Sequence, residues 1–310
     1  MKTVLIALLR LVRFPNLVIV GLTQWLIAQQ VLGQAFLQDT VTPVLSTAEL
    51  GFLIVATACV TGLGYVVNDI LDYEIDLVNR PERVIVGRIL SRAAAKALVI
   101  SLGVIGFLAA LYLAISKGEL EWLWLYPVFT GLLLLYPTVL KRHYLLGNLF
   151  VALACAGTAG LVWLAERSSW RALGESLQQQ TQQLIVLFML YAFVSTWIRE
   201  IVKDLEDQEG DRSQGRQSMP LRWGVQRAKQ LIWILTLVLL LALGQLFVTD
   251  VLVELQLIGQ ALLLALMLLL LYFSWMLYQA SEQQNYHQLS QAWKFYLLGG
   301  LGILLCYQLT

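Results

Sequence analysis

Nine apolar runs of roughly 20 residues follow one another along this chain, and they constrain its fold more than any other feature. A helix needs about 20 apolar residues to cross a bilayer, where lipid offers no partner for an open backbone. The chain is 59% hydrophobic and only 13% charged, which excludes an ordinary soluble domain. We predict an all-α, multi-pass membrane bundle of nine transmembrane helices, at about 15–33, 48–70, 94–116, 120–137, 147–165, 181–202, 229–249, 256–278 and 292–309.

Lysine and arginine are divided unevenly between the loops that these helices would leave on the two sides of the membrane. If the helices alternate in direction, most of the 21 basic residues lie on the side of the N-terminus, and only Lys117, Arg167 and Arg171 lie opposite. Basic loops stay in the cytoplasm. We therefore expect the N-terminus and the basic loops inside the cell (inner) membrane and the C-terminus outside. No nucleic-acid partner is expected, and the sequence does not indicate an oligomeric state.

A cluster of acids follows the second apolar run directly. Asp69, Asp72 and Asp76 have the spacing i, i+3, i+7, and Asn68 lies four residues before Asp72. On one helix these side chains would share a face, where like charges repel each other. We therefore expect a cation to hold them.

The same pattern returns 135 residues later as Asp204, Asp207 and Asp211. Both copies end apolar runs that point the same way, which predicts a parallel internal repeat with one shared site. The chain would then be a single transmembrane domain, 1–310, with repeat halves at about 1–140 and 141–290 and a final helix. Acids at a solvated helix end are common, but two copies in one register have no obvious structural use.

Oxygen clusters that lack His and Cys suit a hard cation such as Mg²⁺, which commonly shares its ligands with phosphates. Nearby arginines and lysines suit the phosphates themselves, so the site would promote departure of a diphosphate from an allylic carbon. Nearby aromatic rings such as Tyr65 and Tyr136 could stabilise an allylic cation. The candidate catalytic residues are Asp72, Asp76, Asp207 and Asp211, and the candidate metal ligands are Asn68, Asp69, Asp72, Asp76, Asp204, Asp207 and Asp211.

These motifs resemble those of the UbiA superfamily of intramembrane prenyltransferases. The resemblance covers most of the chain to about residue 224 and includes the segments 13–16, 79–81, 136–142 and 147–148. It implies a nine-helix fold with a central cavity, and two Mg²⁺ ions bridging a prenyl diphosphate. Asn68, Asp72, Asp207 and Asp211 would lie on the metal side. The candidate diphosphate ligands are Arg88, Lys141, Arg142, Lys203 and Tyr136.

Segments 83–88 and 199–204 look most similar to the family branch that transfers a geranylgeranyl group to geranylgeranylglyceryl phosphate. A surplus of basic residues on the motif side also favours a second phosphate, and hence this acceptor, over an aromatic acid. The basic segments 80–96 and 212–229 are expected to form a cytoplasmic cap that shields the reaction from water.

Other functions stay open at this point. An aromatic-acceptor prenyltransferase of quinone biosynthesis would share the diphosphate chemistry, and a UbiA-like terpene cyclase would use it without an acceptor. An ion-coupled transporter would also carry acids in or beside the membrane. Both acidic clusters fall on one predicted face, whereas a transporter is expected to have its ionisable site near the midplane.

Overall fold

Helices make up nearly all of the regular structure in this computed structural model, which describes residues 2–79, 82, 84–140, 143–213, 215, 217–249 and 251–308. The prediction of an all-α fold is confirmed. The chain divides into two units, one of Met1–Leu22 with Leu45–Arg142 and the other of Thr23–Val44 with His143–Thr310. The change at residue 142 lies next to the predicted boundary between repeat halves, but the segment 23–44 and the final helix belong with the second unit.

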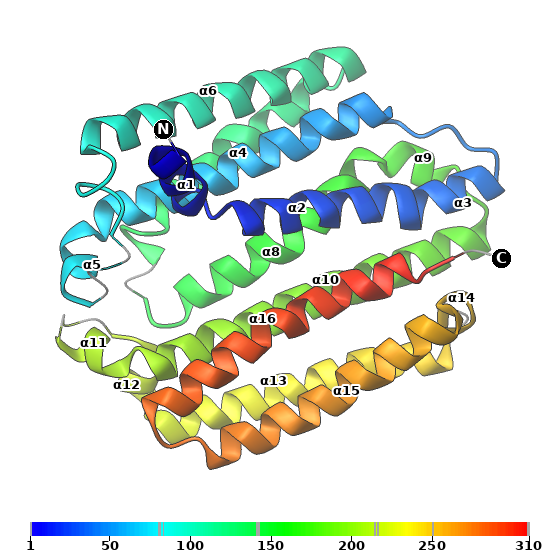
Figure 1. Cartoon of the computed structure of the whole chain (residues 1–310). Coiled ribbons are helices and arrows are strands. Elements are labelled where there is room, and N and C mark those ends of the chain that lie inside the picture. The colour runs from blue at the N-terminus through cyan, green and yellow to red at the C-terminus, as the bar shows by residue number, and fades with distance from the viewer. Residues whose placement is uncertain are drawn as a thin grey trace. The chain divides into compact units, whose positions relative to one another are not determined.

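The first unit is built around α4 and α6, which pack along each other (Figure 1). Serine caps start both helices: Ser46 accepts a hydrogen bond from the backbone of Glu49, and Ser91 from that of Ala94. The helices of this unit are α1 (Lys2–Leu11), the first part of α2 (Phe14–Leu26), α4 (Thr47–Leu71), α5 (Tyr73–Asn79), α6 (Arg92–Lys117), η3 (Leu120–Trp124) and α7 (Leu125–Leu135).

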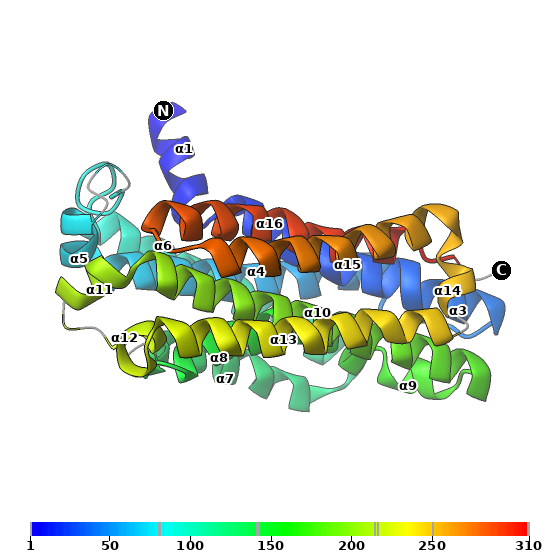
Figure 2. The same ribbon diagram turned by 90° about the horizontal axis from the view of Figure 1, so that it is seen from below.

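The second unit is organised around α10, which packs against α8, α13 and α16. Trp293 of α16 donates to the carbonyl of Ser195 over 2.7 Å, and the Tyr191 hydroxyl donates to the Tyr296 carbonyl. In Figure 2, α11 and α12 lie at one end of this bundle and α14 at the other. The elements of this unit are the end of α2, η1 (Ile27–Leu32), α3 (Gly33–Gln38), α8 (Leu146–Ala165), α9 (Arg167–Arg171), α10 (Glu175–Glu206), α11 (Gln208–Ser213), α12 (Met219–Trp223), α13 (Val225–Gln245), η5 (Leu246–Val248), α14 (Val251–Glu254), α15 (Gln256–Gln279) and α16 (Gln283–Leu305).

Glutamines in the otherwise apolar segment 24–34 have a structural use. Gln30 and Gln34 both donate to the carbonyl of Tyr307, over 2.6 and 3.3 Å, just after α16 ends. Carbonyls at the end of a helix have no partner within it. The two glutamines therefore satisfy a group that lipid could not.

Seven of the described helices are long and apolar enough to cross a membrane. They fit a multi-pass membrane protein, but the predicted count of nine is not confirmed. The fourth predicted run is divided into η3 and α7, which together form only a shorter apolar helix, Leu120–Leu135. The ninth run belongs to α16, which starts earlier, at Gln283, in polar sequence.

Candidate functional site

The first acidic motif lies where α4 ends and α5 begins. Asp72 is the C-cap of α4, with φ −82° and ψ 4°. Its N–H bonds to the Asn68 carbonyl over 2.8 Å, and the N–H of Asp76 bonds to the Asp72 carbonyl over the same distance. The chain therefore bends at Asp72, which is only 8% exposed, instead of continuing as the single helix that the spacing suggested.

Arg13, immediately before α2, holds Asp69. Its Nη2 lies 3.3 Å from the Asp69 Oδ1, and its guanidinium covers the Tyr65 ring at 4.4 Å from the centroid. Asn16 donates to the Tyr65 hydroxyl over 3.1 Å. Arg13 has φ 51°, an uncommon conformation for a residue with a side chain, and this turn separates α1 from α2. One carboxylate of the first motif is thus paired with a cation from outside the motif.

The second acidic motif lies at the corresponding break between α10 and α11. Asp207 is the C-cap of α10, with φ −93° and ψ 9°. Its N–H bonds to the Lys203 carbonyl over 2.9 Å, and the N–H of Asp211 bonds to the Asp207 carbonyl over 2.9 Å. Asp204 accepts a hydrogen bond from Asn148 of α8, with Nδ2 2.7 Å from Oδ2. The two motifs therefore share their local construction: a long helix, an aspartate C-cap, and a short helix after it.

The repeat also includes the donors that hold the first aspartate of each motif. Arg13 precedes Asp69 by 56 residues, and Asn148 precedes Asp204 by 56 residues. Arg13 lies just before α2, and Asn148 is the third residue of α8. Each unit thus ties its motif to the start of an earlier helix, at equivalent positions of the repeat.

Lys203, a predicted diphosphate ligand, shares one carboxylate with its neighbour Arg199. Glu200 accepts from Lys203 Nζ over 2.8 Å and from Arg199 Nη1 over 3.1 Å. Glu200 keeps only 12% of its side chain exposed, so it removes part of the surplus positive charge expected at this end of α10. The Arg199 Nε is buried and makes no hydrogen bond to any described residue.

The described part of the first basic loop is ordered and lies against α5. Gly87 has φ +82°, and a Cβ added to it would stand 2.6 Å from Cε2 of Tyr73. Arg92 binds the Glu74 carboxylate over 3.1 Å and covers the Tyr73 ring at 4.3 Å. Val86 and Leu90 are buried in a cluster that also holds Ala7, Leu11, Val66 and Ala95. These contacts present Arg88 on an exposed turn.

The remaining predicted phosphate ligands are placed only in part. Tyr136 is the half-buried C-cap of α7. Lys141 and Arg142 lie outside the described residues, as do the further basic residues Arg80, Arg83 and Arg216.

The motif oxygens come in two sets, one in each unit. The first unit holds Asn68, Asp69, Asp72 and Asp76, and the second holds Asp204, Asp207 and Asp211. Within the described parts of the chain, no group of three or more His, Cys, Asp or Glu side chains is arranged to hold a metal ion. Mg²⁺ usually completes its octahedral shell with waters and substrate phosphates, so it does not need a cage made by protein alone. A donor set made only of oxygens fits this metal chemically.

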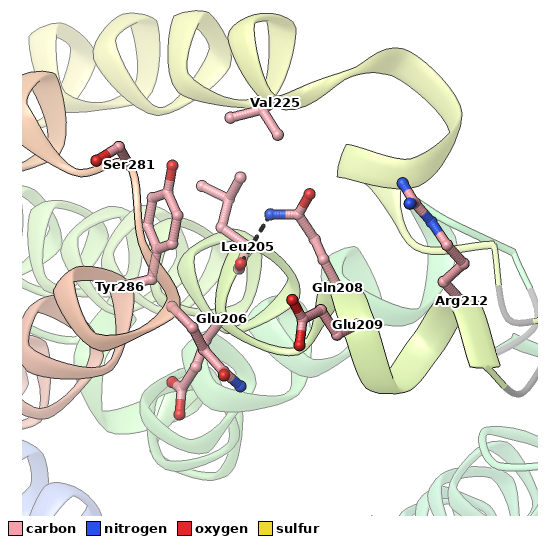
Figure 3. A pocket seen from close by; sticks show the side chains of 9 residues that line it. Leu205, Glu206, Gln208, Glu209, Arg212, Val225, Ser281 and Tyr286 are labelled. Atoms are coloured by element: carbon pink, nitrogen blue, oxygen red, sulfur yellow. Dashed lines mark hydrogen bonds between the residues drawn. The ribbon is translucent and has the colours of Figure 1, made fainter.

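A cavity of about 510 Å³ lies beside the second motif, within the second unit (Figure 3). None of the described motif aspartates lines it. Glu206, Glu209 and Arg212 give it more negative than positive charge, which does not suit a diphosphate. Its other lining residues are Leu205, Gln208, Val225, Ser281, Gln283 and Tyr286.

Comparison with known proteins identifies the family. Residues 31–299 match the model of the UbiA prenyltransferase family. This chain belongs to the UbiA prenyltransferase family. The family predicted from the acidic motifs is thereby confirmed.

Several curated relatives in the UbiA family are named digeranylgeranylglyceryl phosphate synthase. The protein of Methanothermobacter thermautotrophicus is 36% identical over 57% of this chain and 56% of its own length, so this alignment spans little more than half of that relative. The protein of Thermococcus sibiricus is 32% identical over 72% of this chain and 70% of its own, and that of Methanosarcina mazei is 33% identical over 71% and 72%. These names agree with the branch that the sequence resembles.

Solved structures show that the UbiA fold is shared along the chain. A structure of digeranylgeranylglyceryl phosphate synthase in membranes has a TM-score of 0.67 at 21% identity and covers 98% of both chains. An apo UbiA homologue from Aeropyrum pernix K1 has a TM-score of 0.63 at 18% identity, covering 91% of this chain and 97% of that one. A UbiA homologue from Archaeoglobus fulgidus bound to GPP and Mg²⁺ has a TM-score of 0.55 at 16% identity and covers 96% and 99%.

The residue pattern did not predict three contacts at the acidic motifs, made by Arg13, Asn148 and Glu200. Arg13 and Asn148 contact aspartates 56 residues away in the sequence, and the contacts of Glu200 depend on the rotamers of Arg199 and Lys203. Helical periodicity predicts neither kind of contact. A signal did exist for the first two. Extending the 135-residue register backwards from Asp69 and Asp204 would have aligned Arg13 with Asn148.

Proposed function

We propose that this chain is a Mg²⁺-dependent enzyme that transfers a prenyl group, in our proposal geranylgeranyl, from its diphosphate to geranylgeranylglyceryl phosphate. The observation that carries the proposal is the pair of matched helix ends, each with an aspartate C-cap and a second aspartate four residues later. The names of the relatives support the choice of substrates.

The proposed metal ligands are drawn from the motif oxygens: Asn68, Asp69, Asp72 and Asp76 in the first unit, and Asp204, Asp207 and Asp211 in the second. Bound Mg²⁺ would neutralise charge on the diphosphate and make it a better leaving group. Asn68 donates to Asp72 over 2.9 Å, which fixes the direction in which the Asp72 carboxylate presents its oxygens. Because Asp72 is buried, this orientation is kept without competition from bulk water.

Lys203 and Arg88 are the described residues proposed to bind diphosphate oxygens. Glu200 holds Lys203 at 2.8 Å, which restricts a long side chain that would otherwise lose rotamer freedom on binding. Arg88 lies on the turn that Tyr73, Gly87 and Arg92 keep against α5. We propose that this loop excludes water from the reacting carbon, with Lys141, Arg142 and Tyr136 as further candidates on the diphosphate.

The two motifs are proposed to bind one diphosphate together. Their local geometries match, because each has an aspartate C-cap and a second aspartate four residues later. The reaction breaks the bond between the allylic carbon and the diphosphate oxygen. It forms an ether bond to the acceptor hydroxyl oxygen, and that hydroxyl loses its proton.

The identity of the acceptor is a separate part of the proposal. The basic surplus that favoured a second phosphate is smaller than the sequence suggested, because Arg199 and Lys203 share Glu200. The preference for geranylgeranylglyceryl phosphate is therefore supported mainly by the relatives that carry the corresponding name. An aromatic acid is the competing acceptor.

The deciding experiment supplies purified protein with Mg²⁺ and geranylgeranyl diphosphate. Parallel reactions contain geranylgeranylglyceryl phosphate, 4-hydroxybenzoate, a naphthoate or no acceptor, and products are identified by mass spectrometry. We expect the digeranylgeranyl ether in the first reaction only. Preferential prenylation of either aromatic would overturn the acceptor, and a cyclic hydrocarbon without any acceptor would indicate a terpene cyclase. Absence of diphosphate release in every reaction would overturn the proposal that this chain is a prenyltransferase.

The proposed topology places both motifs in the cytoplasm. It rests on the excess of basic residues in the loops beside the motifs, which favours the inner side of the membrane. Single cysteines placed at Glu82 and Lys117, in a variant without native cysteines, would test it. An impermeant thiol reagent added to intact cells should label only position 117, and the opposite result would reverse the orientation.

A further inference from the structure

The first helix, α1, has two apolar sides, and the rest of the first unit covers only one of them. The inner side supplies Ala7 and Leu11, which are 2% and 0% exposed. Both lie in the apolar cluster that also buries Val86 and Leu90 of the basic loop. The turn that carries Arg88 is therefore held by α1 as well as by α5.

The outer side of α1 is apolar as well, but it is exposed. Leu5, Ile6 and Leu9 are 58%, 50% and 39% exposed. Arg10 is exposed in the last turn of the same helix. Apolar side chains with a basic residue beside them are typical of helices that lie in the membrane interface, whereas water would solvate such a surface poorly.

The position of α1 in the first unit matches the depth of that interface. The apolar cluster joins α1 to Val66, near the end of α4, and to Ala95, in the first turn of α6. The turn at Arg13, where φ is 51°, separates α1 from the candidate span that begins at Phe14. In Figure 2, α1 runs across the direction of α4 instead of along it. Because membrane spans end at the border between lipid and water, a helix that crosses their ends lies in that border.

The exposed surface of α2 continues the apolar contact from this level. Phe14, Val18 and Leu22 are all exposed and lie four residues apart, so they line one side of the span. In a membrane protein that side faces lipid. Since it starts at the first residue of α2, lipid reaches the chain at the turn that directly follows α1.

We infer that α1 is an interfacial helix whose outer side binds lipid, and that this binding holds the basic loop in place through Val86 and Leu90. The partner is the interface between lipid and water on the side of the motifs, where Arg10 is placed to reach lipid phosphates. The contact with lipid follows from α1 alone, while its effect on catalysis rests on the proposed function of the loop at Arg88.

Spin labels on single cysteines, in a variant without native cysteines, would locate the outer side of α1. In vesicles of phosphatidylcholine and phosphatidylglycerol, collisions of each label with oxygen, which concentrates in lipid, are compared with collisions with a water-soluble nickel chelate. Leu268, 57% exposed on α15, is the lipid control, and Ser281, exposed between α15 and α16, is the water control. We expect labels at Leu5 and Leu9 to favour oxygen less than the label at Leu268 and more than that at Ser281. Labels as accessible to nickel as the one at Ser281 would overturn the inference.

A double variant, Leu5→Gln with Leu9→Gln, tests whether the lipid contact holds the loop. In the same vesicles, hydrogen exchange of the Ile89 and Leu90 amides should rise several-fold, because both amides bond to the Ile85 carbonyl within the turn. Leu5→Phe with Leu9→Phe is the matched control. It keeps an apolar surface but changes its shape, so exchange should stay at the wild-type rate where fluid lipid covers this side.

Two results of the exchange experiment would overturn the inference. Unchanged exchange in the glutamine variant would show that the loop does not depend on the lipid contact. Faster exchange in the phenylalanine variant as well would replace lipid with a protein partner of fixed shape, such as a second copy of this chain.

Activity gives a further readout in the same vesicles. The glutamine variant should release a several-fold larger share of hydrolysed prenyl alcohol from geranylgeranyl diphosphate, because the loop is proposed to exclude water. Failure of the proposed function would look different. No variant, nor the wild type, would then release diphosphate, while the label and exchange measurements would still decide whether α1 lies in the interface and holds the loop.

Discussion

Asn68 and Asp72 are joined twice: the Asn68 carbonyl accepts from the Asp72 backbone over 2.8 Å, and the Asn68 amide donates to the Asp72 carboxylate over 2.9 Å. The first bond ends α4, and the second turns the carboxylate of the residue at that end. One asparagine therefore decides both where the helix stops and how the following acid is aimed.

Asn68→Ala should lower transfer activity more than tenfold, because the Asp72 carboxylate would keep its charge and lose its fixed direction as well as a neighbouring oxygen ligand. Asp72→Asn should lower activity at least a hundredfold. Steady-state rates at several Mg²⁺ concentrations would measure both losses. Unchanged far-ultraviolet circular dichroism should accompany them, because the backbone bond between the two residues remains.

The two motifs are expected to act as one site, and a double variant tests this directly. Asp72→Asn and Asp207→Asn should each nearly abolish Mg²⁺-dependent diphosphate release, and the combined variant should be hardly slower than either. Groups that act as a unit lose their joint function when one is removed. If the two losses multiply instead, the motifs work independently and the shared site is wrong.

The sequence predicted most of the long helices, because a segment that crosses a membrane needs about 20 apolar residues, but the count of nine is not confirmed. It did not predict the breaks at Asp72 and Asp207. The i, i+3, i+7 spacing is compatible with one straight helix, and only the observed backbone angles show where each helix ends. The fourth run looked like one span, but its aromatic first turn forms the separate η3.

The residue types of the site were predictable, while their individual partners were not. Acidic spacing alone indicated a cation site, but it could not predict that Asp204 accepts from Asn148. Counting arginines and lysines overstated the positive charge, because neutralisation of Lys203 by Glu200 depends on side-chain rotamers. Such distinctions depend on contacts with other helices and on local rotamers, which a residue pattern does not contain.

Gly87→Ala should displace the turn of the basic loop that carries Arg88 away from its position against Tyr73. Alanine would be strained at φ +82°, and its Cβ would stand 2.6 Å from the Tyr73 ring. We expect a several-fold higher KM for the prenyl diphosphate and a larger share of hydrolysed prenyl alcohol, measured by chromatography of the products. Gly118→Ala is the matched control: it has φ +70° but nothing within 4 Å of the added Cβ. That variant should lose stability without changing the product ratio, and an equal rise in alcohol from both would contradict a role for the loop.

Glu200 and Lys203 should affect different kinetic constants. Lys203→Ala removes a charge proposed to bind the diphosphate, so KM for the prenyl diphosphate should rise about tenfold, as expected for a hydrogen bond to a charged group. Glu200→Gln leaves Lys203 and Arg199 charged but without their shared carboxylate. KM should then stay the same or fall, because more positive charge faces the diphosphate, while kcat should fall several-fold as Lys203 loses its fixed position. The KM of Glu200→Gln should also depend more steeply on salt concentration. A rise in KM for Glu200→Gln that matched the rise for Lys203→Ala would show that Glu200 helps to bind the substrate, and would contradict a role limited to holding the lysine.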